Sequence, residues 1–268
     1  MPKQPKQKKP PARRRRFRRR LIALAVVLSL VGGFIALSLT ILFPATRVVV
    51  VGQTRYSAQQ FTEVLQLEQL QPNLFLADTQ ALVERAEGAL PYANIVRVTR
   101  QLPNALRFHV EDHAPVFAQY QDELWWLIAD NGRLLEQTET PPEAGILMLR
   151  GTDLLDPEPG RNAQWERGLT RPGDLHSLFD ALHESSLWPD VTGVRISGYA
   201  IPDVIYQDRI RIRFGSPAQE DDLSDKLRQA EQVITRLNEQ NPNYRGMLDL
   251  GVAGQIPFTP MWGNEWQP

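Results

Sequence analysis

The sequence predicts an α+β protein with a single N-terminal transmembrane helix, a compact β-α-α-β-β domain and a mostly antiparallel β domain with flanking helices. Three observations predict this class. An uncharged apolar run covers residues 21–43. Residues 44–114 place two helix-like segments between strand-like ones, and short alternating strands recur through residues 115–250. Residues 251–268 are expected to add an edge strand and a tail.

The first 20 residues are very basic. They hold four lysines and seven arginines but no acidic residue, and the first acid of the chain is Glu63. The net charge of -1 conceals this asymmetry, because the remaining 19 basic residues stand against 31 acids. Cations beside a membrane span keep that side in the cytoplasm and attract anionic lipids. We therefore expect residues 1–20 to form a cytoplasmic tail.

The apolar run is long enough to cross a lipid bilayer. Residues 21–43 are 23 consecutive residues without a charge, and such a helix is roughly 35 Å long at about 1.5 Å per residue. Pro44 follows at once and helps to end the helix. This predicts a single-pass protein of the cell membrane whose C-terminal part lies outside the cytoplasm.

Three other interpretations of the N-terminus fit less well. A cleaved signal peptide has a shorter apolar stretch, and the sequence after Phe43 is a poor cleavage site. The segment Arg14-Arg15-Arg16-Phe17 resembles a twin-arginine export signal, but any dense arginine run gives such a match. Nucleic-acid binding is not needed to explain a basic run that directly abuts a span.

The first folded domain is predicted to open with a strand and two helices. Four valines in residues 47–52 predict a buried strand close to the membrane. Ser57, followed three residues later by Gln60, indicates a capping box at the start of a helix. Either Asp78 or Thr79 can cap the second helix.

A β-hairpin is predicted to complete this domain. Residues 94–100 and 106–111 alternate between apolar and polar side chains, and the Gln-Leu-Pro-Asn segment at 101–104 is typical of a turn. Val96 and Val98 are expected to face the core, and the polar residues between them to face water.

The motifs of this domain resemble the POTRA domain of the FtsQ/DivIB family of bacterial cell-division proteins. The most specific are Arg100-Gln101-Leu102-Pro103-Asn104-Ala105-Leu106 and Val110-Glu111-Asp112-His113-Ala114-Pro115. Their position directly after a single N-terminal span adds to the resemblance. Further matching segments are Val50-Val51-Gly52, Asn73-Leu74-Phe75 and Leu90-Pro91.

The second domain resembles the β domain of the same family less closely. A strand followed by an Asp and Gly turn is predicted at residues 124–132, further strands at 147–151, 194–196, 210–215 and 247–250, and a short helix at 175–183. A long helix beginning at Pro217 carries an apolar stripe of Leu223, Leu227, Ala230, Ile234 and Leu237. Gly251 stands where the family usually has arginine. The Pro- and Gly-rich stretch 154–172 is expected to be a surface loop.

The sequence contains no recognisable catalytic motif, whether Gly-x-Ser-x-Gly, Ser-x-x-Lys, HExxH or a phosphate-binding glycine loop. His176 and His183 are about 10 Å apart along a helix, too far to share a metal ion, and the lack of cysteine excludes thiolate sites. We expect no enzyme activity, cofactor, metal, small-molecule substrate or nucleic-acid partner. Of the adjacent Trp125 and Trp126, one ring is expected in the core and one at the surface; Trp262 could anchor a partner, as could Trp266.

The resemblance implies a non-enzymatic scaffold that binds other membrane proteins of the division machinery at the septum. In the family, the last β strands accept a strand from the FtsB/DivIC partner, which is paired with FtsL. Carried over by position, the partner-binding residues are Met247, Leu248, Asp249, Leu250, Val252, Gln255, Ile256 and Phe258. Pro257 lacks an N–H, so a receptive edge must end there or turn that position away from the partner.

Three alternatives remain open at this point. The last strands could be an ordinary closing pair with a loose tail. The chain could handle secreted polypeptides by strand addition, although such proteins usually carry several POTRA units. It could also be a membrane-anchored cell-wall enzyme. The early strand and the second helix of the first domain are a further candidate binding surface, implied by the resemblance, on which no single residue stands out.

Overall fold

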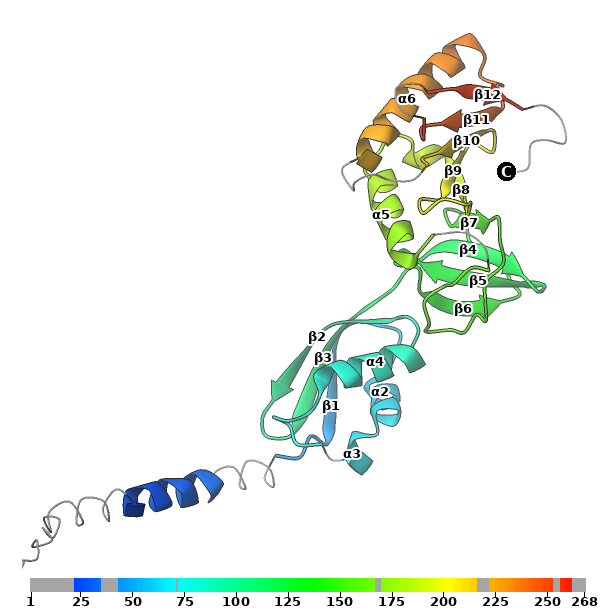
Figure 1. Ribbon diagram of the computed structural model, residues 1–268. Helices are drawn as coiled ribbons and strands as arrows, with labels where there is room; N and C mark the ends of the chain where they lie inside the picture. The colour runs from blue at the N-terminus through cyan, green and yellow to red at the C-terminus, as the bar shows by residue number, and fades with distance from the viewer. Residues whose placement is uncertain are drawn as a thin grey trace, which may run out of the picture.

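The computed structural model describes residues 22–34, 43–70, 72–166, 170–215, 222–252 and 256–261 (Figure 1). Residues 22–34 form a helix with exposed side chains. Within the described ranges, no helix has the length and apolar character needed to cross a membrane. Residues 21 and 35–42 of the predicted span lie outside the described residues.

The first domain is a three-stranded sheet with helices on one face (Figure 1). The sheet order is β1-β3-β2, with β1 parallel and β2 antiparallel to the central β3. Its elements are β1 Arg47–Gln53, α2 Ala58–Leu65, α3 Leu67–Leu70, α4 Thr79–Ala89, β2 Ala93–Gln101 and β3 Ala105–Asp112. This confirms the predicted β-α-α-β-β order and adds the single turn α3.

Both predicted helix caps are present. The Ser57 side chain accepts from the Gln60 N–H, and the Gln60 side chain accepts from the Ser57 N–H at 2.8 Å, which forms a reciprocal capping box. Asp78, rather than Thr79, caps α4 by accepting from the N–H groups of residues 80 and 81. The two helices therefore begin where local hydrogen bonding favours them.

Two burial predictions for this domain are wrong. The valine strand β1 is half-buried to exposed, because it lies at the sheet edge and only β3 pairs with it. Val96 is 61 % exposed rather than in the core. A bulge between Ile95 and Arg97 shifts the alternation of β2, so Ile95 takes the buried position.

The second domain is built on a nine-stranded sheet within the described residues. Its order is β12-β11-β10-β9-β8-β7-β4-β5-β6, and five of the eight neighbouring pairs are antiparallel. The strands are β4 Pro115–Gln121, β5 Leu124–Ala129, β6 Leu134–Thr138, β7 Leu147–Arg150, β8 Val191–Arg195, β9 Asp203–Tyr206, β10 Ile210–Arg213, β11 Gly246–Asp249 and β12 Phe258–Pro260.

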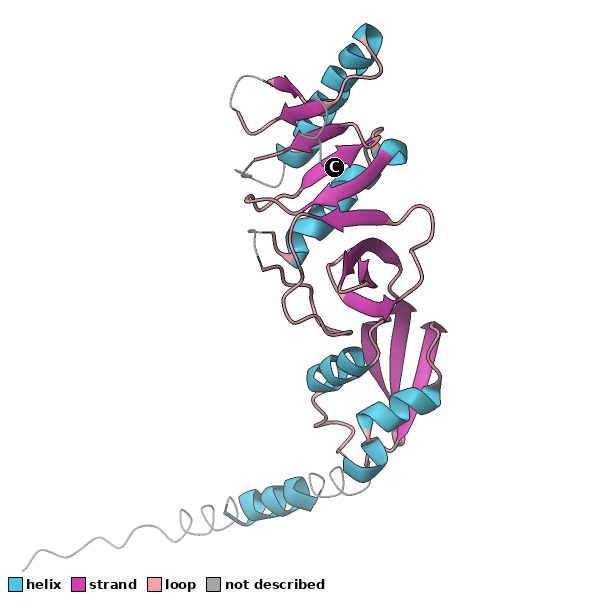
Figure 2. Ribbon diagram, turned by 90° about the vertical axis from the view of Figure 1, so that its right-hand side faces the viewer, coloured by secondary structure: helices cyan, strands magenta, loops and turns pink. Residues whose placement is uncertain are grey.

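Two helices cover one face of this sheet (Figure 2). They are α5, Pro172–His183, and α6, Asp222–Gln240; a 3-10 turn, η1, spans Trp188–Asp190. α5 starts three residues before its predicted position, because Pro172 suits the first helical turn and the Asp174 carboxylate accepts from the Arg171 N–H at 2.7 Å. The start predicted for α6, at Pro217, lies outside the described residues.

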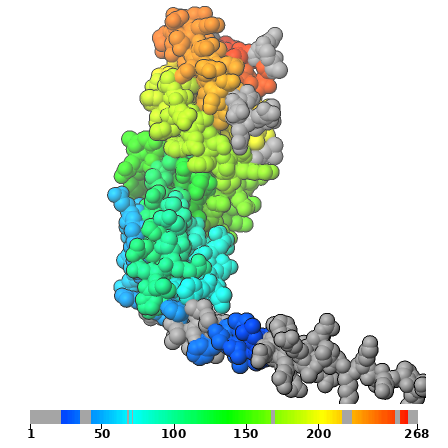
Figure 3. All heavy atoms as spheres, turned by 90° about the vertical axis from the view of Figure 1, so that its left-hand side faces the viewer, coloured from blue at the N-terminus to red at the C-terminus, as the bar shows by residue number. Residues whose placement is uncertain are grey.

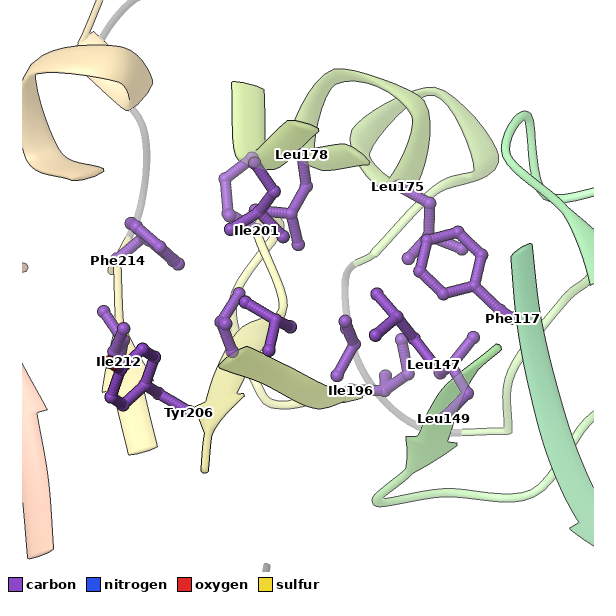
Figure 4. Packing of buried hydrophobic residues seen from close by; sticks show 14 of the residues in the cluster. Phe117, Leu147, Leu149, Leu175, Leu178, Ile196, Ile201, Tyr206, Ile212 and Phe214 are labelled. Atoms are coloured by element: carbon purple, nitrogen blue, oxygen red, sulfur yellow. The ribbon is translucent and has the colours of Figure 1, made fainter. Parts of the chain in front are cut away.

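The core of the second domain lies between the sheet and these helices. Leu175 and Leu178 of α5 point toward side chains from the strands, including Phe117 and Leu147 (Figure 4). The predicted α6 stripe faces the same core, with Leu237 only partly buried and the other four members buried: Leu223, Leu227, Ala230 and Ile234. Helical periodicity in the sequence therefore located this face correctly.

The predicted surface loop is partly buried. Leu154 is 2 % exposed and Ala163 is fully buried. The Gln121 carboxamide oxygen accepts from the Leu154 N–H at 2.7 Å, and the Trp165 indole donates to the Gln119 side chain at 3.1 Å. These contacts hold an irregular segment against the core.

Trp125 and Trp126 occupy opposite faces of β5. Trp126 is 4 % exposed and belongs to the main core. The Trp125 ring is half-buried and packs on Tyr120, with ring centroids 4.9 Å apart. This agrees with the expectation of one core and one surface ring.

Candidate functional site: the C-terminal sheet edge

The candidate site is the end of the large sheet formed by β11 and β12. β11 pairs with β10 on its inner side, in parallel, and with β12 on its outer side, antiparallel. In the part of the chain that the structure describes, β12 is the last strand of the sheet (Figure 1). Its outer backbone groups form an edge to which another strand could bond.

The hydrogen-bond pattern shows which residues of β12 face outward. The Asp249 N–H donates to the Pro257 carbonyl at 3.1 Å, and the Met261 N–H donates to the Arg245 carbonyl at 3.0 Å. Because inward-facing and outward-facing positions alternate along an antiparallel edge strand, Phe258 and Pro260 direct their backbone groups outward. Pro257 faces inward, as a receptive edge requires.

The outward edge is short and not uniform. Phe258 offers both an N–H and a carbonyl, whereas Pro260 offers only a carbonyl because proline has no N–H. A partner strand could therefore exchange two hydrogen bonds with Phe258 and donate one to Pro260. Proline at the second position limits uncontrolled edge-to-edge pairing.

The Phe258 ring holds β12 in place. Phe258 pairs with the fully buried Leu248 and packs against the core beside Ile256. Its ring lies over Gly246 and 6.2 Å from the Tyr244 ring, measured between centroids. A side chain at residue 246 would collide with this ring, so glycine permits the contact.

The structure brings most of the predicted partner-binding residues together but gives them different roles. Leu248 and Leu250 are buried and Met247 is half-buried. Val252 is 46 % exposed, whereas Ile256 and Phe258 are half-buried. The Asp249 carboxylate accepts from the Gly251 N–H at 2.9 Å. Gln255, Trp262 and Trp266 lie outside the described residues.

The unusual glycine at 251 has a packing explanation. Gly215 has a φ of +75°, and a Cβ added to it would lie 2.7 Å from the Gly251 Cα. A Cβ at Gly251 would in turn lie 3.1 Å from both the Gly215 Cα and the Asp249 carboxylate. The two backbones approach closely at this point, and small residues on both sides make the approach possible.

A row of charged side chains crosses the sheet beside this edge, which the sequence interpretation missed. Arg150 is in register with Arg195, Arg195 with Asp203, and Arg213 with Asp249. The Arg213 guanidinium lies 3.7 Å from the Asp203 carboxylate, which joins the two halves of the row. All five side chains lie on the sheet face turned away from the core. In the sequence, the alternation of arginine and isoleucine along β10 was the signal that could have revealed this row.

Asp203 is the buried centre of this row. Its side chain is fully buried, accepts from the Arg211 Nε at 2.6 Å and from the Ser197 hydroxyl at 3.3 Å. Burial raises the pKa of the Asp203 carboxyl, and Arg211 acts against that shift. With Arg211, the row contains four arginines and two carboxylates. On the strands nearest the candidate edge, Arg211 and Arg213 pair with Asp203 and Asp249, whereas Arg150 and Arg195 lie farther away, on β7 and β8.

The described residues show no cluster of three or more His, Asp or Glu side chains that could hold a metal ion. His176 instead lies 3.3 Å from the Asp130 carboxylate and 3.6 Å from that of Asp180. The Asp180 contact is within α5, and the group is exposed at the surface. It is a solvent-exposed contact between polar side chains.

Comparison with known proteins supports the family resemblance. Residues 43–113 match the model of the FtsQ-type POTRA domain. Over 189 residues, the chain is 25 % identical to the cell division protein DivIB of Clostridium botulinum (strain Loch Maree, type A3), which covers 69 % of this chain and 70 % of that protein. It is 24 % identical to the DivIB of C. botulinum strain Hall over the same shares.

Proposed function

We propose that this chain, which belongs to the FtsQ/DivIB family of cell-division proteins, is a membrane-anchored and non-enzymatic scaffold that binds other divisome membrane proteins during septum formation. The observation that carries the proposal is the outer edge of β12, which has outward backbone groups at Phe258 and Pro260. An extended segment of a partner would add to the sheet there and continue its hydrogen-bond ladder.

The proposed partner is an FtsB/DivIC-like protein paired with an FtsL-like protein. Val252 and Ile256 flank the edge and would supply apolar contacts. The 21–43 segment would anchor the chain in the cell membrane, with residues 1–20 in the cytoplasm.

A truncation after Val252 tests the proposal. It removes β12 but keeps β11, which belongs to the body of the sheet through its parallel pairing with β10. The full chain should capture the purified coiled-coil partners in a pull-down and the truncated chain should not. Undiminished capture by a folded truncated chain would place the binding surface elsewhere and contradict the proposal.

A pair of substitutions at one residue separates backbone from side-chain recognition. Phe258→Ala removes the ring and keeps the outward N–H, whereas Phe258→Pro removes both. If a partner strand bonds to this N–H, Phe258→Pro should bind several-fold to about tenfold more weakly than Phe258→Ala, the cost of one hydrogen bond. Thr259→Ala is the matched control, because the Thr259 side chain is exposed. Equal affinities of the two Phe258 variants would exclude strand addition at this position.

A further inference from the structure

Four large apolar side chains are exposed at one end of the POTRA domain. Leu70, at the end of α3, is 54 % exposed, and Leu102, in the turn between β2 and β3, is 63 % exposed. Phe75 and Leu76, in the turn before α4, are 45 % and 74 % exposed. We call these four residues the basal patch.

Hydrogen bonds place the parts of the basal patch at the same end of the domain. The Arg100 Nε, at the end of β2, donates to the Leu74 carbonyl at 2.7 Å. The Asn104 carbonyl, beside Leu102, accepts from the Thr46 and Arg47 N–H groups at 3.0 and 3.1 Å. In Figure 1, α3 and the start of β1 lie at the end of the domain from which the N-terminal segment leaves.

The basal patch packs directly against the end of the apolar N-terminal run. Phe43 is the last residue of that run. Its carbonyl accepts from the Leu74 N–H at 2.8 Å, and its ring packs edge-to-face on Phe75 with centroids 5.5 Å apart. Figure 3 shows this end of the domain with the helix of residues 22–34 next to it, in blue.

The turn that carries Phe75 and Leu76 is held in shape by its neighbours. The Asn73 carboxamide oxygen accepts from the N–H groups of Phe75 and Leu76 at 2.9 and 3.2 Å. Leu74 and Ala77 are buried on either side of these two residues. Leu74 and Ala77 therefore pack into the core, whereas the bulkier Phe75 and Leu76 between them are exposed to solvent.

We propose that the basal patch inserts into the interfacial layer of the lipid bilayer that anchors the chain. If residues 21–43 cross the membrane, as the proposed function requires, Phe43 lies at its surface, and Phe75 of the patch packs on the Phe43 ring. Adjacent exposed apolar side chains mark contact surfaces. The exposed Arg47 and Arg100 beside the patch suit anionic headgroups.

Insertion would give the domain a second attachment to the membrane besides the chain itself. Two attachments restrict the tilt and rotation of a domain, whereas a single chain connection leaves both free. The POTRA domain would then hold the rest of the outer region in a fixed orientation above the bilayer, available to partners that are themselves embedded in the membrane.

Site-specific labelling tests the insertion. The chain has no cysteine, so Leu76→Cys in the full chain accepts one environment-sensitive fluorophore. The protein is reconstituted alone in vesicles of phosphatidylethanolamine and phosphatidylglycerol, with and without nitroxide-labelled lipid as quencher. Val96→Cys is the matched control, because Val96 is similarly exposed, at 61 %, but lies in β2 away from the hairpin turn. We expect a blue-shifted emission and at least twofold stronger quenching at residue 76 than at residue 96.

A third labelled variant, Leu30→Cys, separates this inference from the proposed anchoring. Deep quenching at residue 30 with equal quenching at residues 76 and 96 would leave the anchor intact and overturn the insertion. No quenching at residue 30 would overturn the anchor and the insertion together. Burial of the residue 76 probe in native membranes but not in pure vesicles would assign the patch to a protein partner, which also overturns the proposal.

Discussion

Gly246 decides, at the scale of a single residue, whether the last strand can pack. A Cβ at this position would lie 2.3 Å from the Thr259 carbonyl oxygen and 2.8 Å from the Phe258 ring. The first of these is backbone, which cannot rotate away as a side chain can. The pairing of β12 with β11 therefore depends on the absence of a side chain at residue 246.

We predict that Gly246→Ala displaces β12 and lowers the free energy of unfolding by about 1–3 kcal/mol, the usual cost of forcing an atom into a packed site. The amides of Asp249 and Met261, which bond across this pair, should exchange with solvent faster in hydrogen-exchange measurements. Gly173→Ala is the control, because a Cβ there meets nothing within 4 Å. Unchanged protection of both amides in Gly246→Ala would contradict the prediction.

Tyr92 makes a pH-dependent contribution at the junction of the two domains. Burial, together with a hydrogen bond to the Glu136 side chain, raises the pKa of Tyr92 from the ordinary 10.0 of tyrosine to about 12. The folded protein therefore holds this proton more tightly than the unfolded chain does. The contribution of Tyr92 to stability is fully present below pH 10 and is lost as the pH rises toward 12.

Urea unfolding across this pH window measures the effect. Between about pH 10 and 12 the wild-type midpoint should fall more steeply than that of Tyr92→Phe, which has no proton to lose at this position. Tyr56 and Tyr206, whose pKa values are also raised by burial, contribute equally to both proteins and cancel. Parallel midpoint curves would show that folding does not raise the pKa of Tyr92.

Arg133 connects the two domains at the scale of their secondary-structure elements. Its Nε donates to the Pro91 carbonyl at 3.0 Å, and its guanidinium also donates to the Glu87 carbonyl. The Glu87 carboxylate lies 3.9 Å away. Gly160 approaches the same helix end so closely that a Cβ would lie 2.4 Å from the Gly88 carbonyl oxygen. The Glu87 carbonyl near the end of α4 and the Pro91 carbonyl that follows the helix thus accept from the other domain.

We predict that Arg133→Ala lowers the free energy of unfolding by about 1.5–3 kcal/mol, because it removes charged donors from partly buried carbonyls. Arg161→Ala is the matched control. Arg161 pairs with Glu158 at 2.8 Å, but both side chains are more than half exposed, so its loss should cost about 0–1 kcal/mol. Chemical denaturation of both variants measures the difference, and equal losses would refute a structural role for the junction.

At the scale of the whole molecule, we predict that the folded domains after the membrane span lie outside the cytoplasm. An enzyme reporter that matures only outside the cytoplasm, fused behind Pro268, should be active, and a reporter that works only inside should be inactive. Replacing the seven arginines of residues 13–20 with glutamine should reduce the outside activity, because positive charge holds the N-terminus in the cytoplasm. A C-terminal reporter active only inside would contradict the membrane anchoring on which the proposed function rests.

Local physical chemistry let the sequence by itself determine several parts of this protein. The capping box at Ser57, a cap at Asp78 or Thr79, the hairpin turn at 101–104 and the apolar stripe of α6 all depend on residues a few positions apart. Such interactions are present in the sequence as spacings, and the structure contains each of them. The family resemblance was readable for the same reason, because its most specific motif is one continuous hairpin.

Only the tertiary structure decided which strands are neighbours and which side chains are buried. Val96 is exposed because a bulge shifts β2 against β3, and Asp203 can be buried because Arg211 and Arg213 reach it from the next strand. Leu154 is covered through contacts with a strand more than 30 residues away. Which backbone groups of β12 face outward likewise follows from its register with β11. Outside the hairpins, which strands pair and how they align depends on segments distant in sequence, so one segment alone does not specify it.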